Sequence, residues 1–258
     1  MSKDKEGNAA MRREYGLSSD FIGQVHDVEK TYTYLRGFFE GAGMRLSLRA
    51  LGDMRKWHNG QCRKGGLPYI IHPMRMSCHA IEYWRPGDTN LTDDFFAILL
   101  LHDVVEDVTS SINVSVREMG YNDVISRGVE YMTLTRFHNE TKYELKKRYY
   151  NELPMDMHSA LAKGFDKSDN LSTMVGAFRD DPNRIRKNVV EVDLLTLPML
   201  RAAKGKWPEA GSLFQGLKRD IRRMNNMLAI MYGVMLTDKN FVNVADAKDY
   251  SYLLTESK

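Results

Sequence analysis

Hydrophobic residues recur along this chain with helical spacing almost throughout. Apolar positions three and four residues apart mark four helices, at residues 21–39, 44–57, 72–84 and 93–107. The same pattern marks further helices at residues 115–133, 140–152, 156–178, 183–203 and 211–236. No pair of strands stands out between them, and no internal repeat is detectable. The pattern therefore predicts an all-α fold.

Clusters of Gly, Pro, Asn, Asp and Ser separate the predicted helices, at residues 65–68, 85–90, 110–113 and 180–183. Thr92 is expected to cap the helix that begins at Asp93, whose carboxylate suits the positive end of the helix dipole. The polar residues 1–18 are expected to be disordered. A break at KGKWP (204–208) separates a main domain, residues 19–203, from a predicted C-terminal helical appendage, residues 204–258.

Composition narrows the class of protein. The 258 residues are 43% hydrophobic, enough for a sizeable core, and the formal charge of +3 is too small to indicate nucleic-acid binding through a bulk field. No apolar run approaches the roughly 20 residues of a membrane span, and the polar start is unlike a signal peptide. The two cysteines form no Cys-x-x-Cys pair, which argues against a thiolate metal site. We therefore expect a cytoplasmic protein.

Residues 99–108 read LLLHDVVEDV, an apolar run that contains His102, Asp103, Glu106 and Asp107. Burying such groups without compensation is destabilising by several kcal/mol, and a metal ion is the usual compensation. On an α-helix, residues three and four apart share a face, so Asp103, Glu106 and Asp107 are expected to point the same way. His102 lies about 100° around from Asp103, close enough to share one ion.

Two other segments supply candidate partners. His72 precedes Pro73 at the start of a predicted helix, where backbone amides favour anions. Asp166 and Asn170 lie one turn apart on another helix, and Thr173 follows a turn later. By contrast, the second His-Asp pair of the chain, His26-Asp27, has no such partners and is expected to be an ordinary surface pair.

Taken together, RKGGLPYIIHP, LLHDVVED and KGFDKSDNLSTM resemble the hydrolase half of the RelA/SpoT family of alarmone enzymes, which belongs to the HD-domain metal-dependent phosphohydrolases. The resemblance covers about residues 45–180, and the three blocks follow one another in the family's order. It implies an HD-domain helical bundle for residues 19–203.

The resemblance also implies roles for individual residues. A manganese ion, or another divalent metal, would be held by His72, His102, Asp103 and Asp166. Imidazoles and carboxylates suit such an ion. Glu106 and Asp107 would act on the hydrolytic water. Contacts to the nucleotide would come from Arg63, Lys64, Asn170 and Thr173, with the guanidinium of Arg63 suited to stacking on a base.

This sequence departs from the family pattern at several positions. Val108 replaces the usual Thr, Gly65 a common Ser, and Leu67 a polar residue, while Lys167, Ser168 and Asp169 replace Arg-Leu-His. These changes affect nucleotide contacts more than metal ligands, so we expect them to alter base preference before hydrolysis. Asp169 also opens a second register, in which it replaces Asp166 as the fourth ligand. Asp166 is preferred because it keeps Asn170 and Thr173 at their family positions.

The expected function is removal of the 3′-pyrophosphate from guanosine tetra- or pentaphosphate. Residues after 185 do not resemble the family's synthetase domain, so a hydrolase-only protein is expected. The same site could serve another 3′-phosphorylated nucleotide, such as an adenosine alarmone, NADPH or a pyrophosphorylated tRNA end. A non-catalytic module that binds an alarmone or a partner protein is the other alternative. The methionine-rich residues 221–235 are expected to be core or a contact in a homo-oligomer.

Overall fold

A computed structural model describes residues 22–63, 66–109, 116–135, 137, 139–236 and 241–243. The expected all-α fold is confirmed. The long helices are α2 (Ile22–Gly41), α3 (Arg45–Trp57), α4 (Ile71–Tyr83), α5 (Asp93–Leu101), α6 (Asp123–Met132), α7 (Lys142–Glu152), α8 (Met157–Ala177), α9 (Pro182–Glu191), α10 (Leu197–Lys206) and α11 (Gly211–Met231). Short π- and 3₁₀-helical turns join them, namely η2 (Val104–Thr109), η3 (Leu153–Met155), η4 (Val192–Thr196) and η5 (Pro208–Ala210).

Helix α5 is the centre of the N-terminal half. Every residue from Phe95 to Leu101 is 0% exposed, since α3, α4, α6 and α8 all pack against it. A helix that is apolar on all sides must be covered on all sides. Because His102 and Asp103 directly follow this buried helix, their positions are set by the core.

Capping hydrogen bonds fix the first turns of α5 and α3. The hydroxyl of Thr92 accepts a hydrogen bond from the Phe95 amide at 3.3 Å, which confirms the predicted cap. Asp93 lies in the first turn of α5, and its side chain also caps α3. Its carboxylate accepts the backbone N–H groups of Leu46 (2.9 Å) and Ser47 (2.7 Å) at the start of α3. Such a cap contributes roughly 0.5–2 kcal/mol, and here it links two helices that are distant in sequence.

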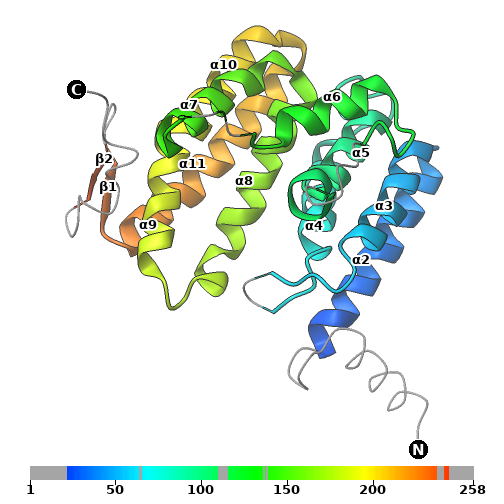
Figure 1. Cartoon of the computed structure of the whole chain (residues 1–258), viewed down its shortest axis with the longest axis horizontal. Coiled ribbons are helices and arrows are strands. Elements are labelled where there is room, and N and C mark those ends of the chain that lie inside the picture. The colour runs from blue at the N-terminus through cyan, green and yellow to red at the C-terminus, as the bar shows by residue number, and fades with distance from the viewer. Residues whose placement is uncertain are drawn as a thin grey trace, which may run out of the picture.

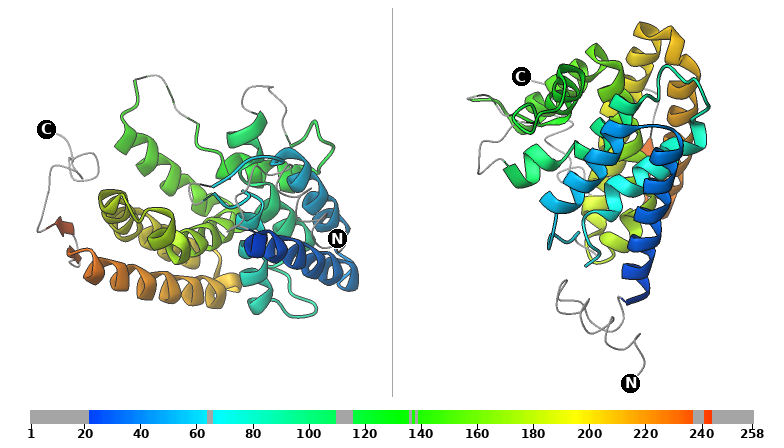
Figure 2. Two further views of the ribbon diagram at one scale, coloured as in Figure 1. Left: turned by 90° about the horizontal axis from the view of Figure 1, so that it is seen from below. Right: turned by 90° about the vertical axis from the view of Figure 1, so that its right-hand side faces the viewer.

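Helix α8 lies between the two halves of the molecule. Figure 1 shows it between the N-terminal helices α2–α5 and the C-terminal helices α9–α11. It packs against α4, α5 and α6 on one side and α10 and α11 on the other, and Figure 2 shows α11 running beside it. The side chains of α8 therefore reach the end of α5 and the start of α4, where the candidate ligands are.

The predicted helix at 93–107 is interrupted. Regular α-helix ends at Leu101, a turn follows at residues 102–103, and η2 continues as a π-helix. The expectation that Asp103, Glu106 and Asp107 share a face assumed α-helical spacing, which does not hold here. Single π-turns within helices are rare and are frequent at functional sites.

Three other helices differ in extent from the prediction. The helix expected at 115–133 begins only at Asp123, after a turn in which Gly120 has a φ of +80°. The helix expected at 183–203 is divided into α9 and α10 by η4. The helix expected at 211–236 ends at Met231 and is followed by an antiparallel pair of strands, β1 (Val234–Leu236) and β2 (Phe241–Asn243), which the pattern did not predict.

The core is continuous from Val28 in α2 to Val234 in β1. Because α11 packs against α8, α9 and α10, residues beyond the proposed break at 204–208 contribute to this core, and the domain division there stays a prediction.

In the methionine-rich segment 221–235, Leu228 is buried while Met227 and Met231 are exposed, and the role of this segment in an oligomer also stays a prediction. The expected disorder of residues 1–18 lies outside the described residues.

Two smaller expectations concern cysteines and membranes. Cys62 and Cys78 are both free thiols, and burial raises the pKa of the Cys78 thiol to about 11. Among the described residues, none of the helices has the length and apolarity that crossing a membrane would require.

Candidate metal centre

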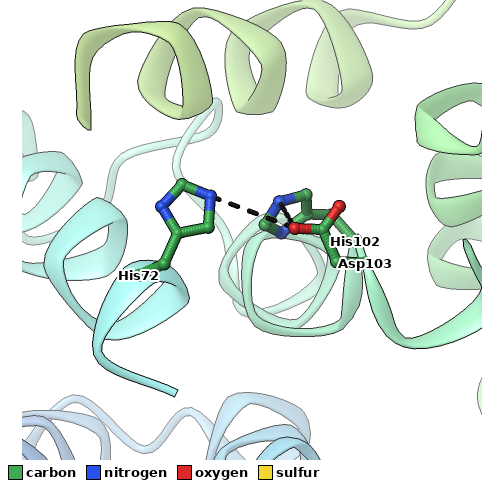
Figure 3. A group of neighbouring side chains, drawn as sticks. All are labelled: His72, His102 and Asp103. Carbon is green, nitrogen blue, oxygen red and sulfur yellow. Dashed lines mark ion pairs between the residues drawn. The ribbon is translucent and has the colours of Figure 1, made fainter. Parts of the chain in front are cut away.

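Three of the predicted ligands lie together where α4 begins and α5 ends. His72 is the second residue of α4, and His102 and Asp103 form the turn after α5. One ligand atom from each lies within 4.8 Å of the other two. Figure 3 shows the imidazole of His72 facing the His102–Asp103 pair across the space between the two helices. Two segments about thirty residues apart are thus joined at one point.

The protonation of His102 follows from its contacts. Its Nδ1 lies 2.9 Å from the carbonyl oxygen of Leu99, which can only accept, so Nδ1 carries a proton. In the neutral ring, Nε2 then has a bare lone pair. This buried Nε2 makes no hydrogen bond within the described structure, although Oδ2 of Asp103 lies 2.8 Å away. The lone pair of Nε2 and the carboxylate oxygen would repel each other at this distance. A cation between them removes the repulsion, and it can be either a proton on His102 or a metal ion.

The charges of the pair stabilise each other. Burial alone would lower the pKa of His102, but the neighbouring carboxylate of Asp103 outweighs it and raises that pKa to about 9. Burial would likewise raise the pKa of Asp103, yet the His102 imidazole holds it well below the usual range. A divalent cation would stabilise the same carboxylate while displacing the proton from His102.

Asp166 on α8 lies close to Nε2 of His72. Its Oδ1 lies 3.3 Å from Nε2 of His72, which is also 3.9 Å from Oδ2 of Asp103. Its Oδ2 pairs with Nζ of Lys163 at 2.8 Å. Burial would raise the pKa of Asp166, but the ammonium of Lys163 keeps it far below its ordinary value. Asp166 is therefore an anion with one oxygen directed toward His72.

Asp169, the alternative ligand, faces the other nitrogen of His72. Its Oδ2 lies 2.6 Å from Nδ1, and its carboxylate also accepts from Arg75 and Arg63. Burial would raise its pKa, but the hydrogen bonds from His72 and Arg75 lower it well below the usual range. Asp166 and Asp169 thus contact opposite edges of one imidazole ring.

The predicted nucleotide contacts lie beside this group. Arg63 donates from Nη1 to Asp169 (3.0 Å) and from Nη2 to Asn170 (2.7 Å). Asn170 in turn donates to Oδ1 of Asp166, and the Thr173 hydroxyl donates to the Asp169 carbonyl at 3.0 Å. A cavity of about 380 Å³ adjoins them, lined by Arg63, Leu67, Arg75, Ser172, Thr173, Gly176 and Ala177. Lys64 lies outside the described residues.

The two predicted catalytic carboxylates belong to η2. Glu106 is exposed, and its Oε2 accepts a hydrogen bond from the backbone N–H of Leu134 at 3.3 Å. This contact connects η2 to the segment after α6. Asp107 is part of the same π-helix, but its side chain lies outside the described residues.

Sequence reasoning missed Tyr69, Arg75 and Lys163. The Tyr69 hydroxyl donates to Oδ2 of Asp103, and the ring of His58 stacks on Tyr69 with 4.6 Å between centroids. Tyr69 stands three residues before His72 in the PYIIHP segment, and that spacing could have indicated a common face. Arg75 and Lys163 had no comparable signal, because each is one of many cations on a helix.

The residues present fit a divalent metal ion. Nitrogens of two buried imidazoles and an oxygen of the partly buried Asp103 carboxylate lie close together, and within the described structure Nε2 of His102 makes no hydrogen bond. Imidazole and carboxylate ligands suit manganese, iron or zinc, so the donor set indicates a metal without identifying it.

Comparison with known proteins points to alarmone enzymes. The chain is 26% identical over 156 residues to a GTP pyrophosphokinase of Streptomyces coelicolor, which is 59% of this chain and 18% of the relative. It is 26% identical over 141 residues to the bifunctional (p)ppGpp synthase/hydrolase SpoT of Escherichia coli, covering 54% of this chain and 19% of the relative. It is 30% identical over 122 residues to a guanosine-3′,5′-bis(diphosphate) 3′-pyrophosphohydrolase of Spiroplasma citri, covering 45% of this chain and 15% of the relative.

The match thus spans about half of this chain and less than a fifth of each relative. No protein-family model matches the chain, and no solved structure matches it at a significant level. Most of these relatives are named as hydrolases or bifunctional enzymes of guanosine tetraphosphate. The resemblance of this chain to the RelA/SpoT family is confirmed.

Proposed function

We propose that this chain is a metal-dependent hydrolase that removes pyrophosphate from the 3′ position of guanosine tetra- or pentaphosphate, leaving GDP or GTP. The observation that carries the proposal is the convergence of His72, His102 and Asp103 on one point, at the positions that the resemblance assigns to metal ligands. The names of the relatives support the substrate class.

Asp166 completes the proposed ligand set. Its Oδ1 is directed toward His72, while Lys163 holds the other oxygen, so it can offer one oxygen to an ion without losing its ion pair. We propose Mn²⁺ as the ion. When bound, such an ion lowers the pKa of a coordinated water and polarises a phosphate oxygen.

The protein's own groups would then position water and nucleotide. Glu106 and Asp107 on η2 orient the attacking water and accept its proton. Arg63, Lys64, Asn170 and Thr173 hold the nucleotide. The edge of the Arg63 guanidinium is engaged by Asp169 and Asn170, which leaves its planar face for stacking on a base. Cations around the site offset the charge of the departing pyrophosphate.

A second substrate is favoured by one observation. Leu67, which stands where the family commonly has a polar residue, lines the cavity beside Arg63 and Thr173. An apolar side chain at this position removes a hydrogen-bonding partner for a base edge. Another 3′-phosphorylated nucleotide, such as an adenosine alarmone or NADPH, is therefore the alternative substrate. We further propose that these 258 residues act without a synthetase domain of their own.

The test is turnover by the purified chain with Mn²⁺. Guanosine tetraphosphate, its adenosine counterpart and NADPH would be compared, and release of pyrophosphate or phosphate and of the nucleotide product would be measured. We expect pyrophosphate and GDP from the first substrate, and no product from Asp103→Ala. If Mn²⁺ is bound and none of the three substrates is hydrolysed, the chain is not this hydrolase. Nucleotide binding without turnover would then be the hypothesis to test.

A further inference from the structure

The Asp169 carboxylate accepts hydrogen bonds from three residues. Its Oδ2 accepts from Nδ1 of His72 (2.6 Å), Nη1 of Arg63 (3.0 Å) and Nη2 of Arg75 (3.0 Å). Its Oδ1 accepts from Nε of Arg75 at 2.7 Å. Each oxygen of an ionised carboxylate offers about two lone-pair positions, so the three hydrogen bonds to Oδ2 occupy that oxygen fully, while Oδ1 accepts one. Oδ2, the oxygen that faces His72, therefore has no free lone pair to offer to a metal ion.

The same contact determines which nitrogen of His72 is free. A carboxylate can only accept, so Nδ1 must carry the proton, and in the neutral ring Nε2 is left with its lone pair. That nitrogen is the one directed toward Asp103 and Asp166. A carboxylate hydrogen-bonded to the far nitrogen of a ligating histidine fixes the ring's orientation and increases its basicity.

Arg75 holds Asp169 in place. It contacts both carboxylate oxygens with two parallel N–H donors, the geometry in which arginine gives the most directional pairing. Arg75 follows His72 by three residues on α4, while Asp169 belongs to α8. The arrangement therefore ties α4 to α8 at the position of the metal centre.

We infer that Asp169 is a positioning residue of the metal centre, held by Arg75, which fixes His72 in the Nδ1-protonated form so that Nε2 is available to a divalent cation. This inference rests on the proposed function, because it takes His72 as a metal ligand. It explains how this chain accommodates an acidic residue where the family pattern has histidine: the added charge is balanced by two guanidinium groups.

The test measures two quantities: the tautomer of His72 in the metal-free protein and the affinity of the protein for Mn²⁺. Two-bond ¹H–¹⁵N spectra identify the protonated nitrogen, and calorimetry gives the dissociation constant. In the wild type, at a pH at which the His72 ring is neutral, we expect the proton on Nδ1. In Asp169→Asn, which sets an amide against the Arg75 donors, we expect a mixture of tautomers. We also expect an Mn²⁺ dissociation constant raised about 10- to 100-fold with one ion still bound.

Two further variants make the experiment decisive if Asp169→Asn folds poorly. Arg75→Gln should weaken Mn²⁺ binding in the same direction but less, because Asp169 remains. Asp180→Asn, which changes an exposed carboxylate after α8, should match the wild type. A neutral His72 ring with its proton on Nε2 in the wild type, or Mn²⁺ binding by Asp169→Asn at wild-type affinity, would overturn the inference. Complete loss of the ion with the tautomer unchanged would make Asp169 a ligand instead, and would also overturn it.

The readout separates this inference from the proposed function. The tautomer is measured without metal or nucleotide. A chain that binds Mn²⁺ through the expected tautomer but releases no pyrophosphate would therefore refute the hydrolase and leave the role of Asp169 standing.

Discussion

Nζ of Lys163 lies 2.8 Å from Oδ2 of Asp166, and both residues are on α8 with little access to solvent. Substitutions in this pair can distinguish an effect on stability from an effect on metal binding. Asp166→Asn should weaken Mn²⁺ binding at least tenfold, because a proposed ligand loses its charge. It should also lower the free energy of unfolding by about 3–5 kcal/mol, because the buried ammonium of Lys163 loses its partner.

The double variant Lys163→Met/Asp166→Asn distinguishes the two effects. With both charges removed, most of the lost stability should return in urea denaturation, while Mn²⁺ binding measured by calorimetry should remain weak. Wild-type affinity in the double variant would show that Asp166 is not a ligand.

Substitution of Glu106 tests the hydrolysis step while leaving the proposed metal ligands in place. Glu106→Ala should bind Mn²⁺ with wild-type affinity and lose at least about a hundredfold in turnover, the usual range for a general base. Stopped assays of pyrophosphate release and calorimetry would be run on the same preparation. Glu118→Gln, an exposed acidic residue in the turn before α6, should retain full activity. Full activity of Glu106→Ala would remove that residue from the mechanism.

Binding of a metal ion should stabilise the fold. At a free Mn²⁺ concentration of a hundred times the dissociation constant, the free energy of unfolding should rise by about 2.7 kcal/mol. A chelator should reverse the shift in melting temperature, and Asp103→Ala should show none. Because the pKa of His102 is raised to about 9 in the metal-free site, the ion must displace its proton. Affinity should therefore increase as pH rises toward 9, and a pH-independent affinity would contradict this.

Glu191 at the end of α9 should make stability dependent on acid pH. Its carboxylate contacts Lys146 and, at 2.6 Å, Lys167. Burial would raise its pKa, but the two ammonium groups lower it well below the ordinary value of 4.5. A lowered pKa in the folded state contributes stability above pH 4.5 that is lost as pH falls toward the folded pKa.

Glu191→Gln should therefore be less stable than the wild type by about 3–5 kcal/mol at neutral pH, because the buried Lys167 and the partly buried Lys146 lose their common partner. The difference between the two proteins should shrink below pH 4.5, as unfolding by urea at several pH values would show. A difference that stays constant down to pH 3 would mean that the pair does not titrate as described.

The packing of α6 on α5 depends on Gly128. A Cβ atom placed there would lie 2.3 Å from Cδ1 of Ile98, which is fully buried and cannot move freely. Gly128→Ala should cost about 1–3 kcal/mol through overpacking. The matched change Gly52→Ala, in α3 with nothing within 4 Å, should be neutral or stabilise the protein by about 0.4–1 kcal/mol. Thermal denaturation of the two variants checks both signs.

Local chemistry explains what could be predicted from the sequence. The apolar run Phe95–Leu101, read with the helical spacing on either side of it, indicates a buried helix, and Thr92 can cap it without help from elsewhere. His72 before Pro73 and the pair His102-Asp103 could be recognised as candidate ligands because each depends on neighbours in the chain. The expected all-α fold followed from the same short-range spacing.

Tertiary structure decided what those patterns left open. Asp166 and Asp169 are both buried on α8, and nothing local distinguishes them as partners of His72. Only the packing of α8 against α4 sets Asp166 against Nε2 and Asp169 against Nδ1, across 97 residues of sequence in the second case. Likewise, the end of regular helix at Leu101 and the strands after α11 were not readable from spacing. Side-chain contacts between distant helices depend on how the helices pack, and sequence by itself determines only which faces are available to pack.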